Sequence, residues 1–236
     1  MTTERNLPLD WVEYYMQRST SCKSEMVFDF YRQGVINPET PIRQAPMVAM
    51  DFETTGLSLE DSEIVSIGLV PFDIRRIYCG ESKHWVVKPE QDMTEESIVF
   101  HGITHSEVEA APTLEVILDQ VLDAIEGKLV VVHYRYIERE FFHKAVMELL
   151  HEPLLFPLLD TMQIEANILK GQQGFFEKLL KKPLDPVRLG YCRRRYNLPH
   201  YDAHNALTDA VATAELLQAQ IAHHLDPDMP VKALWS

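Results

Sequence analysis

The stretch VAMDFETTG, Val48 to Gly56, begins as an apolar strand and ends in two acids and a turn. Side chains two positions apart in a strand leave on the same face, so Asp51 and Glu53 project together and Phe52 projects to the other face. Two carboxylates about 6.5 Å apart repel by roughly 2.5 kcal/mol at an effective dielectric of about 20. No lysine or arginine stands beside them in the sequence. A divalent ion such as Mg²⁺ or Mn²⁺, which prefers oxygen ligands, would remove the conflict, and a solvated polar strand end is the alternative.

The segments around this strand predict an α/β fold. Three strand patterns, residues 46–53, 62–73 and 77–89, follow one another as an antiparallel meander. A helical pattern over residues 113–127, closed by Gly127, then leads to a strand at 128–133 and indicates a crossover to a parallel neighbour. Further helical patterns cover 137–150, 185–199 and 204–225, and a short strand running into a helix covers 153–169. The order predicts a mixed sheet flanked by helices.

Length and composition favour one such domain. The 236 residues suffice for one sizeable core, which we assign to residues 46–225, with an N-terminal helical extension at 1–45 and a tail at 226–236. The three cysteines are odd in number and far apart, which is typical of reduced thiols in the cytoplasm, and neither an export signal nor a membrane span is indicated. The net charge of −14 disfavours binding nucleic acid along a broad basic surface.

A second group of polar residues opens the last helical pattern, DAHNALTDAVATAELL. If that helix begins near Asn205, Asp209 lies about one turn in, near the positive end of the helix dipole, and His204 lies just outside it. Histidine has an ordinary pKa of about 6.5, which suits deprotonation of a water molecule near neutral pH. This helix end therefore combines an acid with a base.

A third group is HYRYIERE, His133 to Glu140, directly after the apolar run KLVVV. Glu138 and Glu140 lie two positions apart on a helical pattern, so they point to different sides of the helix. Whether either acid joins Asp51 and Glu53 depends on the fold.

Together these motifs resemble the DEDDh exonucleases, the proofreading-subunit type within the ribonuclease H-like superfamily. The resemblance covers about residues 46 to 220, and MDFETTGL is similar to the family's opening motif, HNALTDA to its closing motif and FHGIT to its HGIT element. Between these the family has a His-Asn-Ala-x-Phe-Asp stretch, and counting five residues from His133 places Glu138 at the family's aspartate. Here the acid is one methylene longer, and Tyr134 and Arg135 replace the small Asn-Ala pair.

The resemblance implies a ribonuclease H-like mixed five-stranded sheet and hydrolysis of single-stranded nucleic acid from its 3′ end, with DNA favoured, to nucleoside 5′-monophosphates. Two divalent cations, Mg²⁺ or Mn²⁺, would be bound. Asp51 would bridge both ions, Glu53 and Asp209 would hold the first, Glu138 would steady the second, and His204 would be the base. The residues implied to contact the terminal nucleotide are Thr54, Thr55, Gly56, Leu57, His101 and Ile103.

Several alternatives stay open at this point. The altered middle motif also suits a non-catalytic module that binds nucleotides or a protein, although all four residues of the two outer motifs are present. An exonuclease specific for RNA or short oligonucleotides is a narrower alternative. The run Arg193–Arg195 either touches backbone phosphates or forms a solvated helix face, which we favour. A homodimer and a protein partner bound through residues 1–45 are also left open.

Overall fold

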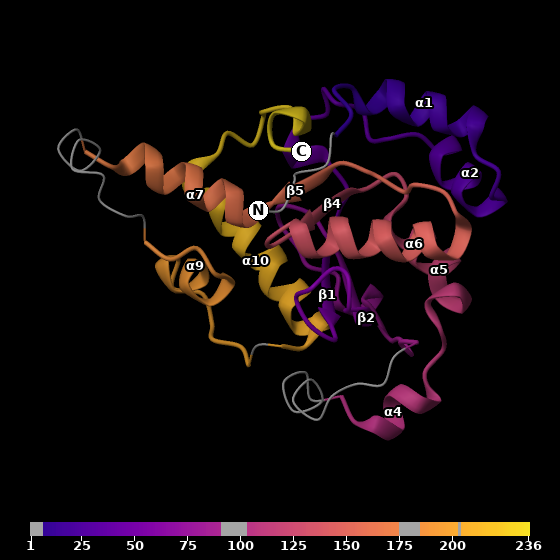
Figure 1. The fold of residues 1–236 in the computed structure, drawn as a ribbon. Helices are drawn as coiled ribbons and strands as arrows, with labels where there is room; N and C mark the ends of the chain where they lie inside the picture. The colour runs from indigo at the N-terminus through magenta and orange to yellow at the C-terminus, as the bar shows by residue number, and fades with distance from the viewer. Residues whose placement is uncertain (1–6, 91–102, 175–184, 203) are drawn as a thin grey trace.

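The described residues form one five-stranded sheet in the order β3–β2–β1–β4–β5 (Figure 1). The computed structural model describes residues 7–90, 103–174, 185–202 and 204–236. β1 pairs antiparallel with β2, which pairs antiparallel with β3, whereas β4 and β5 continue the sheet in parallel. The predicted mixed sheet is thus confirmed. Its strands are β1 (Met47–Thr54), β2 (Ile64–Phe72), β3 (Lys83–Val86), β4 (Leu129–Val132) and β5 (Leu158–Asp160).

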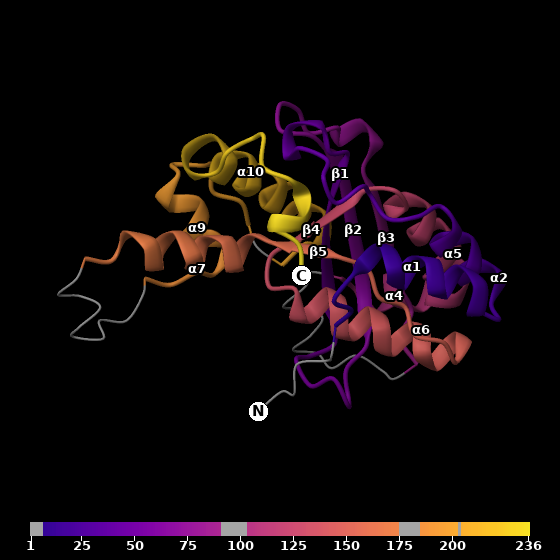
Figure 2. The same cartoon turned by 90° about the horizontal axis from the view of Figure 1, so that it is seen from above.

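Helices cover both faces of this sheet, as Figure 2 shows with the sheet seen on edge. One layer contains α10 (Ala206–His224), α7 (Thr161–Gln172) and α9 (Leu189–Arg195). The opposite layer contains α5 (Leu114–Ile125), α6 (Phe142–Leu150), α1 (Trp11–Ser21) and α2 (Glu25–Arg32). The short α4 (His105–Ala110) precedes α5, a π-helical turn, η3 (Ile137–Phe141), precedes α6, and three 3₁₀ turns complete the list: η1 (Ile42–Gln44), η2 (Cys79–Glu81) and η4 (Val231–Ala233).

Alternation along β1 divides the core into two clusters. Val48, Met50 and Phe52 belong to the cluster that includes α5, α6, α1 and α2. Met47 and Ala49 belong to the cluster that includes α10. Since side chains alternate along a strand, Asp51 and Glu53 fall on the α10 face of the sheet.

The N-terminal helices pack on the main core. Trp11 and Tyr15 of α1 and Tyr31 of α2 are buried in the same cluster as β1. The Tyr31 hydroxyl donates to the Leu155 carbonyl (3.0 Å) and accepts from the Leu155 N–H (2.9 Å). Arg18 adds an ion pair to Glu152 at 3.1 Å. These contacts fix residues 11–32 beside α5 and α6.

Two predicted elements differ from the structure. The third strand was expected over residues 77–89 but spans only four residues, because Cys79–Glu81 forms a 3₁₀ turn in which the Ser82 hydroxyl donates to the Cys79 carbonyl (2.7 Å). The helix expected over 185–199 is confined to Leu189–Arg195, since the prolines at 186 and 199 disfavour a longer one. The expected helix end at Gly127 is confirmed, and that glycine has a φ of +65°.

The last residues cover an edge of the sheet. Leu158 of β5 and Ser236 exchange two backbone hydrogen bonds, at 3.1 and 2.9 Å. Within the described ranges, no helix has the length and apolar character needed to cross a bilayer.

Candidate metal centre

Three of the predicted acids converge between β1 and α10. One carboxylate oxygen each from Asp51, Glu53 and Asp209 lies within 4.8 Å of the other two. At that separation each pair of charges repels by about 3 kcal/mol at an effective dielectric of about 20. The arrangement offers a cluster of hard oxygen ligands, which is what Mg²⁺ and Mn²⁺ prefer.

The first turn of α10 is built as the sequence predicts. The Asn205 side chain caps the helix by accepting from the Thr208 N–H at 3.0 Å, and Asp209 lies in the first turn. The backbone N–H of His204 donates to Asp209 Oδ2 at 2.9 Å, which orients this carboxylate. His204 itself has a φ of +75° and an exposed side chain outside the helix. An exposed histidine therefore stands directly before the helix turn that carries Asp209.

Gly68 lets α10 come this close to the sheet. It pairs with Asp51 across β1 and β2, and cross-strand partners present the same face of a sheet. A Cβ at position 68 would lie 2.3 Å from the carbonyl carbon and oxygen of Ala206 and 2.5 Å from the Leu207 nitrogen. Only glycine therefore permits the first turn of α10 to pack directly over the strand pair that carries Asp51.

Glu138 reaches the same region from η3. Glu138 is only 1% exposed, whereas Glu140 is half-buried, so the two glutamates differ in burial. The backbone N–H of Phe52, which stands between the two acids of β1, lies close enough to this carboxyl to act on its pKa, in the lowering direction. Its Oε2 atom, however, is buried without a hydrogen-bond partner among the described residues. A buried, unpaired carboxylate oxygen is costly, and a bound cation would relieve it.

The electrostatics of the cluster favour the binding of a cation. The pKa of Asp51 is raised well above its usual range by burial first and then by the charges of Glu138, Asp209 and Glu53. Burial is also the main cause that raises the pKa of Glu138 and that of Asp209. Without a cation, these carboxyls therefore retain protons to a higher pH than isolated carboxyls do. The donor set thus fits divalent cations.

Asp160, at the end of β5, holds the segment that leads to Glu138. Its carboxylate accepts from the backbone N–H groups of Tyr134 (3.0 Å) and Arg135 (3.1 Å) and caps α7 through the Met162 N–H (2.9 Å). Arg135 also forms an ion pair with it at 3.4 Å. One buried acid therefore sets both the turn after β4 and the start of α7.

The loop after β1 contains the residues expected to contact a nucleotide. The Thr54 hydroxyl donates to the Gly56 carbonyl at 2.7 Å, and the Thr55 N–H donates to the Glu63 carbonyl at 2.9 Å. These bonds close the loop, and Leu57 at its tip is 79% exposed. From α6, the Lys144 ammonium donates to the Ser62 carbonyl at 3.3 Å, which joins this loop to the helix that follows Glu138.

One of the two remaining predicted contact residues is described by the structure. Ile103 is buried in a small cluster with Val65 and Val108. His101 lies outside the described residues.

The basic run of α9 serves mainly to hold the fold. Arg193 is buried, donates to the Ala212 carbonyl (2.6 Å) and pairs with Glu215 at 2.7 Å. Arg195 pairs with buried Glu165 at 2.7 Å. The expectation of a solvated helix face is therefore wrong for these two arginines, whereas Arg194 is exposed. The alternative of a phosphate contact stays a prediction.

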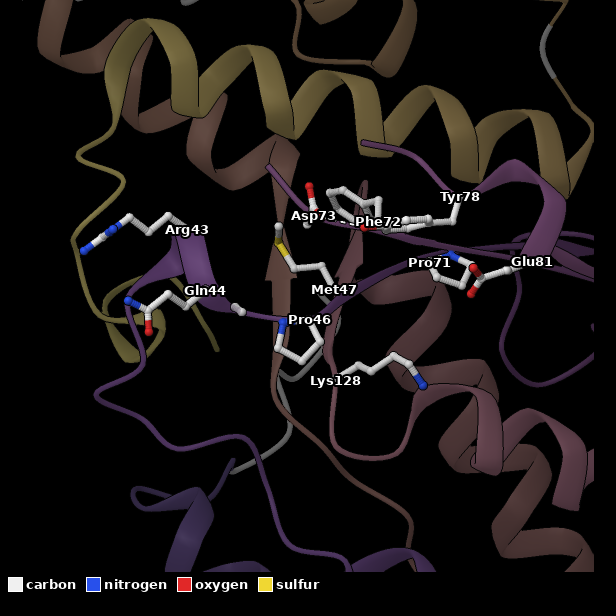
Figure 3. A pocket seen from close by; sticks show the side chains of 11 residues that line it. Arg43, Gln44, Pro46, Met47, Pro71, Phe72, Asp73, Tyr78, Glu81 and Lys128 are labelled. Atoms are coloured by element: carbon white, nitrogen blue, oxygen red, sulfur yellow. Dashed lines mark hydrogen bonds between the residues drawn. The ribbon is translucent and has the colours of Figure 1, made fainter. Parts of the chain in front are cut away.

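A pocket of about 330 Å³ lies at the opposite end of β1 (Figure 3). Pro46, Met47, Pro71 and Phe72 are among the residues that line it, and the charged ends of the lining side chains Arg43 and Lys128 point to opposite sides. None of the predicted site residues lines it. It is therefore separate from the carboxylate cluster.

Sequence reasoning missed Gly68, Asp160 and Lys144. A glycine within a strand pattern signals a close backbone approach, and this rule would have indicated Gly68. Asp160 precedes a helical pattern, which is typical of a helix cap. Its hydrogen bonds to Tyr134 and Arg135, however, require that β4 and β5 lie side by side in the sheet. The contact of Lys144 spans 82 residues and left no local signal.

Comparison with known proteins agrees with this geometry. A family model described as "Exonuclease" matches residues 48–217. The chain is 26% identical over 178 residues to the PolC-type DNA polymerase III of Thermotoga petrophila, covering 75% of this chain and 12% of the polymerase. It is 31% identical over 178 residues to a DNA polymerase III subunit epsilon-like protein of Rhodobacter capsulatus, covering 75% of this chain and 24% of that protein. The chain thus spans only a small part of these relatives' length.

A solved structure shows the same fold. The nuclease domain of 3′hExo, described as a DEDDh family member bound to rAMP, superposes with a TM-score of 0.63 at 18% identity, covering 77% of this chain and 94% of that one. The residues that the Exonuclease family model matches run from β1 to α10. They include Asp51, Glu53 and Asp209, the three residues of the carboxylate cluster. The chain belongs to the Exonuclease family, and its fold is that of the 3′hExo nuclease domain.

Proposed function

We propose that this chain is a metal-dependent exonuclease that shortens single-stranded nucleic acid from the 3′ end and releases nucleoside 5′-monophosphates. The observation that carries the proposal is the meeting of Asp51, Glu53 and Asp209, whose carboxylate oxygens lie within 4.8 Å of one another. Family membership supports the reaction class.

Two divalent cations, Mg²⁺ or Mn²⁺, fit the donor set. Asp51, Glu53 and Asp209 would hold one, and Asp51 with Glu138 would hold the second, Glu138 either directly or through water. Such ions, when bound, neutralise charge that develops on the phosphate and on the leaving oxygen. The free Oε2 atom of Glu138 supports its part in this set.

The chain's own residues would position the substrate and move the proton. His204 has an exposed side chain next to the Asp209 carboxylate and would accept the proton of the attacking water. The loop from Thr54 to Leu57 would lie against the terminal nucleotide, with the exposed Leu57 side chain against its base. Single strands are the proposed substrate, because a 3′ end is expected to enter the site unpaired.

DNA is the favoured polymer, because the relatives reported above are DNA polymerase III proteins. RNA is the second candidate, since the solved domain of the same fold was bound to rAMP. The non-catalytic module suggested by the altered middle motif has weaker support, because Glu138 reaches the acids of β1 despite the substitution.

The test is digestion of 5′-labelled single-stranded DNA and RNA oligonucleotides with Mg²⁺, with Mn²⁺ or with chelator. Wild type should give a metal-dependent ladder that shortens from the 3′ end. Asp51→Asn should abolish the ladder and Glu138→Gln should weaken it by about 10²-fold or more. Glu140→Gln is the matched control, being two residues away on a different side of the helix, and should keep wild-type activity.

The outcomes separate the alternatives. Loss of activity in Glu140→Gln with retention in Glu138→Gln would move the third acid to position 140. Absence of cleavage of either polymer by wild type with either metal would refute the enzyme proposal and leave the binding module.

The remaining expectations about context are also proposals. We propose a cytoplasmic location, in keeping with three unpaired cysteines. A homodimer or a partner bound through residues 1–45 would use the exposed apolar residues there, which are Leu9 before α1 and Val12 and Met16 on α1. Light scattering of wild type and of Met16→Glu tests the dimer, which predicts twice the monomer mass for wild type.

A further inference from the structure

Tyr134 departs from the family pattern in a way that the metal centre does not explain. It stands where the family stretch has a small asparagine, and this larger residue is 45% exposed. Its φ is +81°, a left-handed conformation that a bulky residue rarely adopts. Asp160 holds it there through hydrogen bonds to the N–H groups of Tyr134 and Arg135. The fold therefore maintains a strained backbone that presents an aromatic ring to solvent.

Tyr134 follows β4 at the edge of the sheet that carries the candidate metal centre. β1 and β4 are parallel, with Ala49 level with Val131, so two further residues along each strand reach Asp51 and His133. Tyr134 follows immediately. The carboxylate that holds its N–H also acts electrostatically on Glu138, which in turn acts on Asp51.

A second tyrosine braces the first. The rings of Tyr134 and Tyr136 have centroids 5.9 Å apart at an interplanar angle of 35°. Tyr136 is half-buried and packs against the core cluster of β1 and α6. Among the described residues, the hydroxyl of Tyr134 makes no hydrogen bond. Its ring thus contacts the Tyr136 ring, and 45% of the residue's surface stays open to solvent.

An exposed, oriented aromatic ring beside a phosphodiester-cleaving site suits one kind of ligand. Bases of single-stranded nucleic acid stack on such rings, and stacking tolerates any base because every base has a π-face. We propose that Tyr134, braced by Tyr136, stacks on a base of the bound strand adjacent to the terminal nucleotide. This inference rests on the proposed exonuclease function and adds to it a subsite formed by the segment between β4 and η3.

The first test separates binding from turnover. In Tyr134→Gly the ring is removed and the left-handed conformation becomes favourable, so folding is not compromised. This variant should raise KM for a single-stranded oligonucleotide about tenfold, with kcat much less affected, whereas Tyr134→Phe should keep the wild-type KM. Tyr191→Ala, which removes a similarly exposed tyrosine (46%) from α9, is the matched control and should leave both constants unchanged.

The substrate provides the complementary change. Oligonucleotides with a single abasic site at the second, third or fourth position from the 3′ end remove one base each. At the stacked position, the abasic site should raise the wild-type KM by a factor similar to that of Tyr134→Gly and should abolish the difference between the two proteins. An unchanged KM in Tyr134→Gly, or an equal rise on intact and on all abasic strands, would overturn the stacking role.

A binding measurement keeps this inference separable from the exonuclease proposal. Asp51→Asn protein, with or without Tyr134→Gly, is titrated into oligonucleotides that carry 2-aminopurine, whose fluorescence falls on stacking. Quenching that requires Tyr134 would support the subsite even if wild type cleaves nothing. Cleavage by wild type without Tyr134-dependent quenching would refute the subsite and leave the exonuclease intact. Neither cleavage nor quenching would refute both.

Discussion

Replacing Gly68 by alanine should damage the candidate metal centre from a position that contributes no carboxylate. The new Cβ would lie 2.3 Å from the Ala206 carbonyl group, and ordinary contact begins at 3.4 Å, so the first turn of α10 must move by about 1 Å. That turn carries Asp209, whose N–H bonds the Asn205 carbonyl at 2.9 Å. A displacement of about 1 Å in a catalytic constellation costs on the order of 10²-fold in rate.

The assay compares kcat on a labelled single strand with stability in urea. Overpacking of this kind costs about 1–3 kcal/mol of unfolding free energy, so Gly68→Ala protein should still fold but shorten the strand about 10²-fold more slowly. The Mg²⁺-dependent rise in Tm should also shrink, which reports on the site without turnover. Gly80→Ala, where a Cβ would meet nothing within 4 Å, is the control and should match wild type.

The reasoning would be refuted by a Gly68→Ala protein whose kcat and Mg²⁺-dependent Tm shift both equal those of wild type. Such a result would mean that α10 can retreat from β2 without moving the carboxylate of Asp209. A protein that loses activity but keeps the full Tm shift would instead place the damage in substrate binding.

Three further predictions concern charge. Asp51→Asn should abolish hydrolysis yet raise the metal-free unfolding free energy in urea at about pH 8 by about 1 kcal/mol or more, because one repelling charge is removed; equal or lower stability would contradict this. The raised pKa values of Asp51, Glu138 and Asp209 mean that metal-free stability falls as pH rises above the ordinary carboxyl value of about 4, so Mg²⁺ should raise Tm more at about pH 8 than at about pH 5; a pH-independent shift would count against it. Burial lowers the pKa of His133 from 6.5 to about 4, so the unfolded form binds this proton more tightly than the folded form does. As pH falls from 6.5 to about 4, the unfolding free energy should therefore decrease by up to about 3 kcal/mol. His133→Gln should flatten this loss in urea titrations, and an unchanged slope would assign it elsewhere.

Much of this architecture was predictable because its signals are local. The two-residue spacing in β1 places Asp51 and Glu53 on one face, and the asparagine before α10 caps the helix so that Asp209 falls in its first turn. Both are consequences of backbone periodicity. The family stretch then identified Glu138 by counting, and its burial at 1% exposure agrees with that choice.

The remaining features could not be read from the sequence because they depend on elements that meet only in the folded chain. The helical pattern over 137–150 gave no sign that its first turn is π-helical. The arginines of α9 were expected on a solvated face, but two of them form ion pairs, one with buried Glu165 on α7 and one with half-buried Glu215 on α10. Since α9 is short and bounded by prolines, these ion pairs rather than helical propensity hold it in place.

The alternation along β1 has a consequence for how the chain avoids misfolding. A pairing shifted by one residue would exchange the two faces of the strand. Asp51 and Glu53 would then point into the apolar layer beneath α5 and α6, and Met50 and Phe52 would point at the first turn of α10. Burying two ionised carboxylates without partners is far costlier than losing one apolar contact. The acids that make this chain a candidate enzyme thus also disfavour any register of β1 that is shifted by one residue.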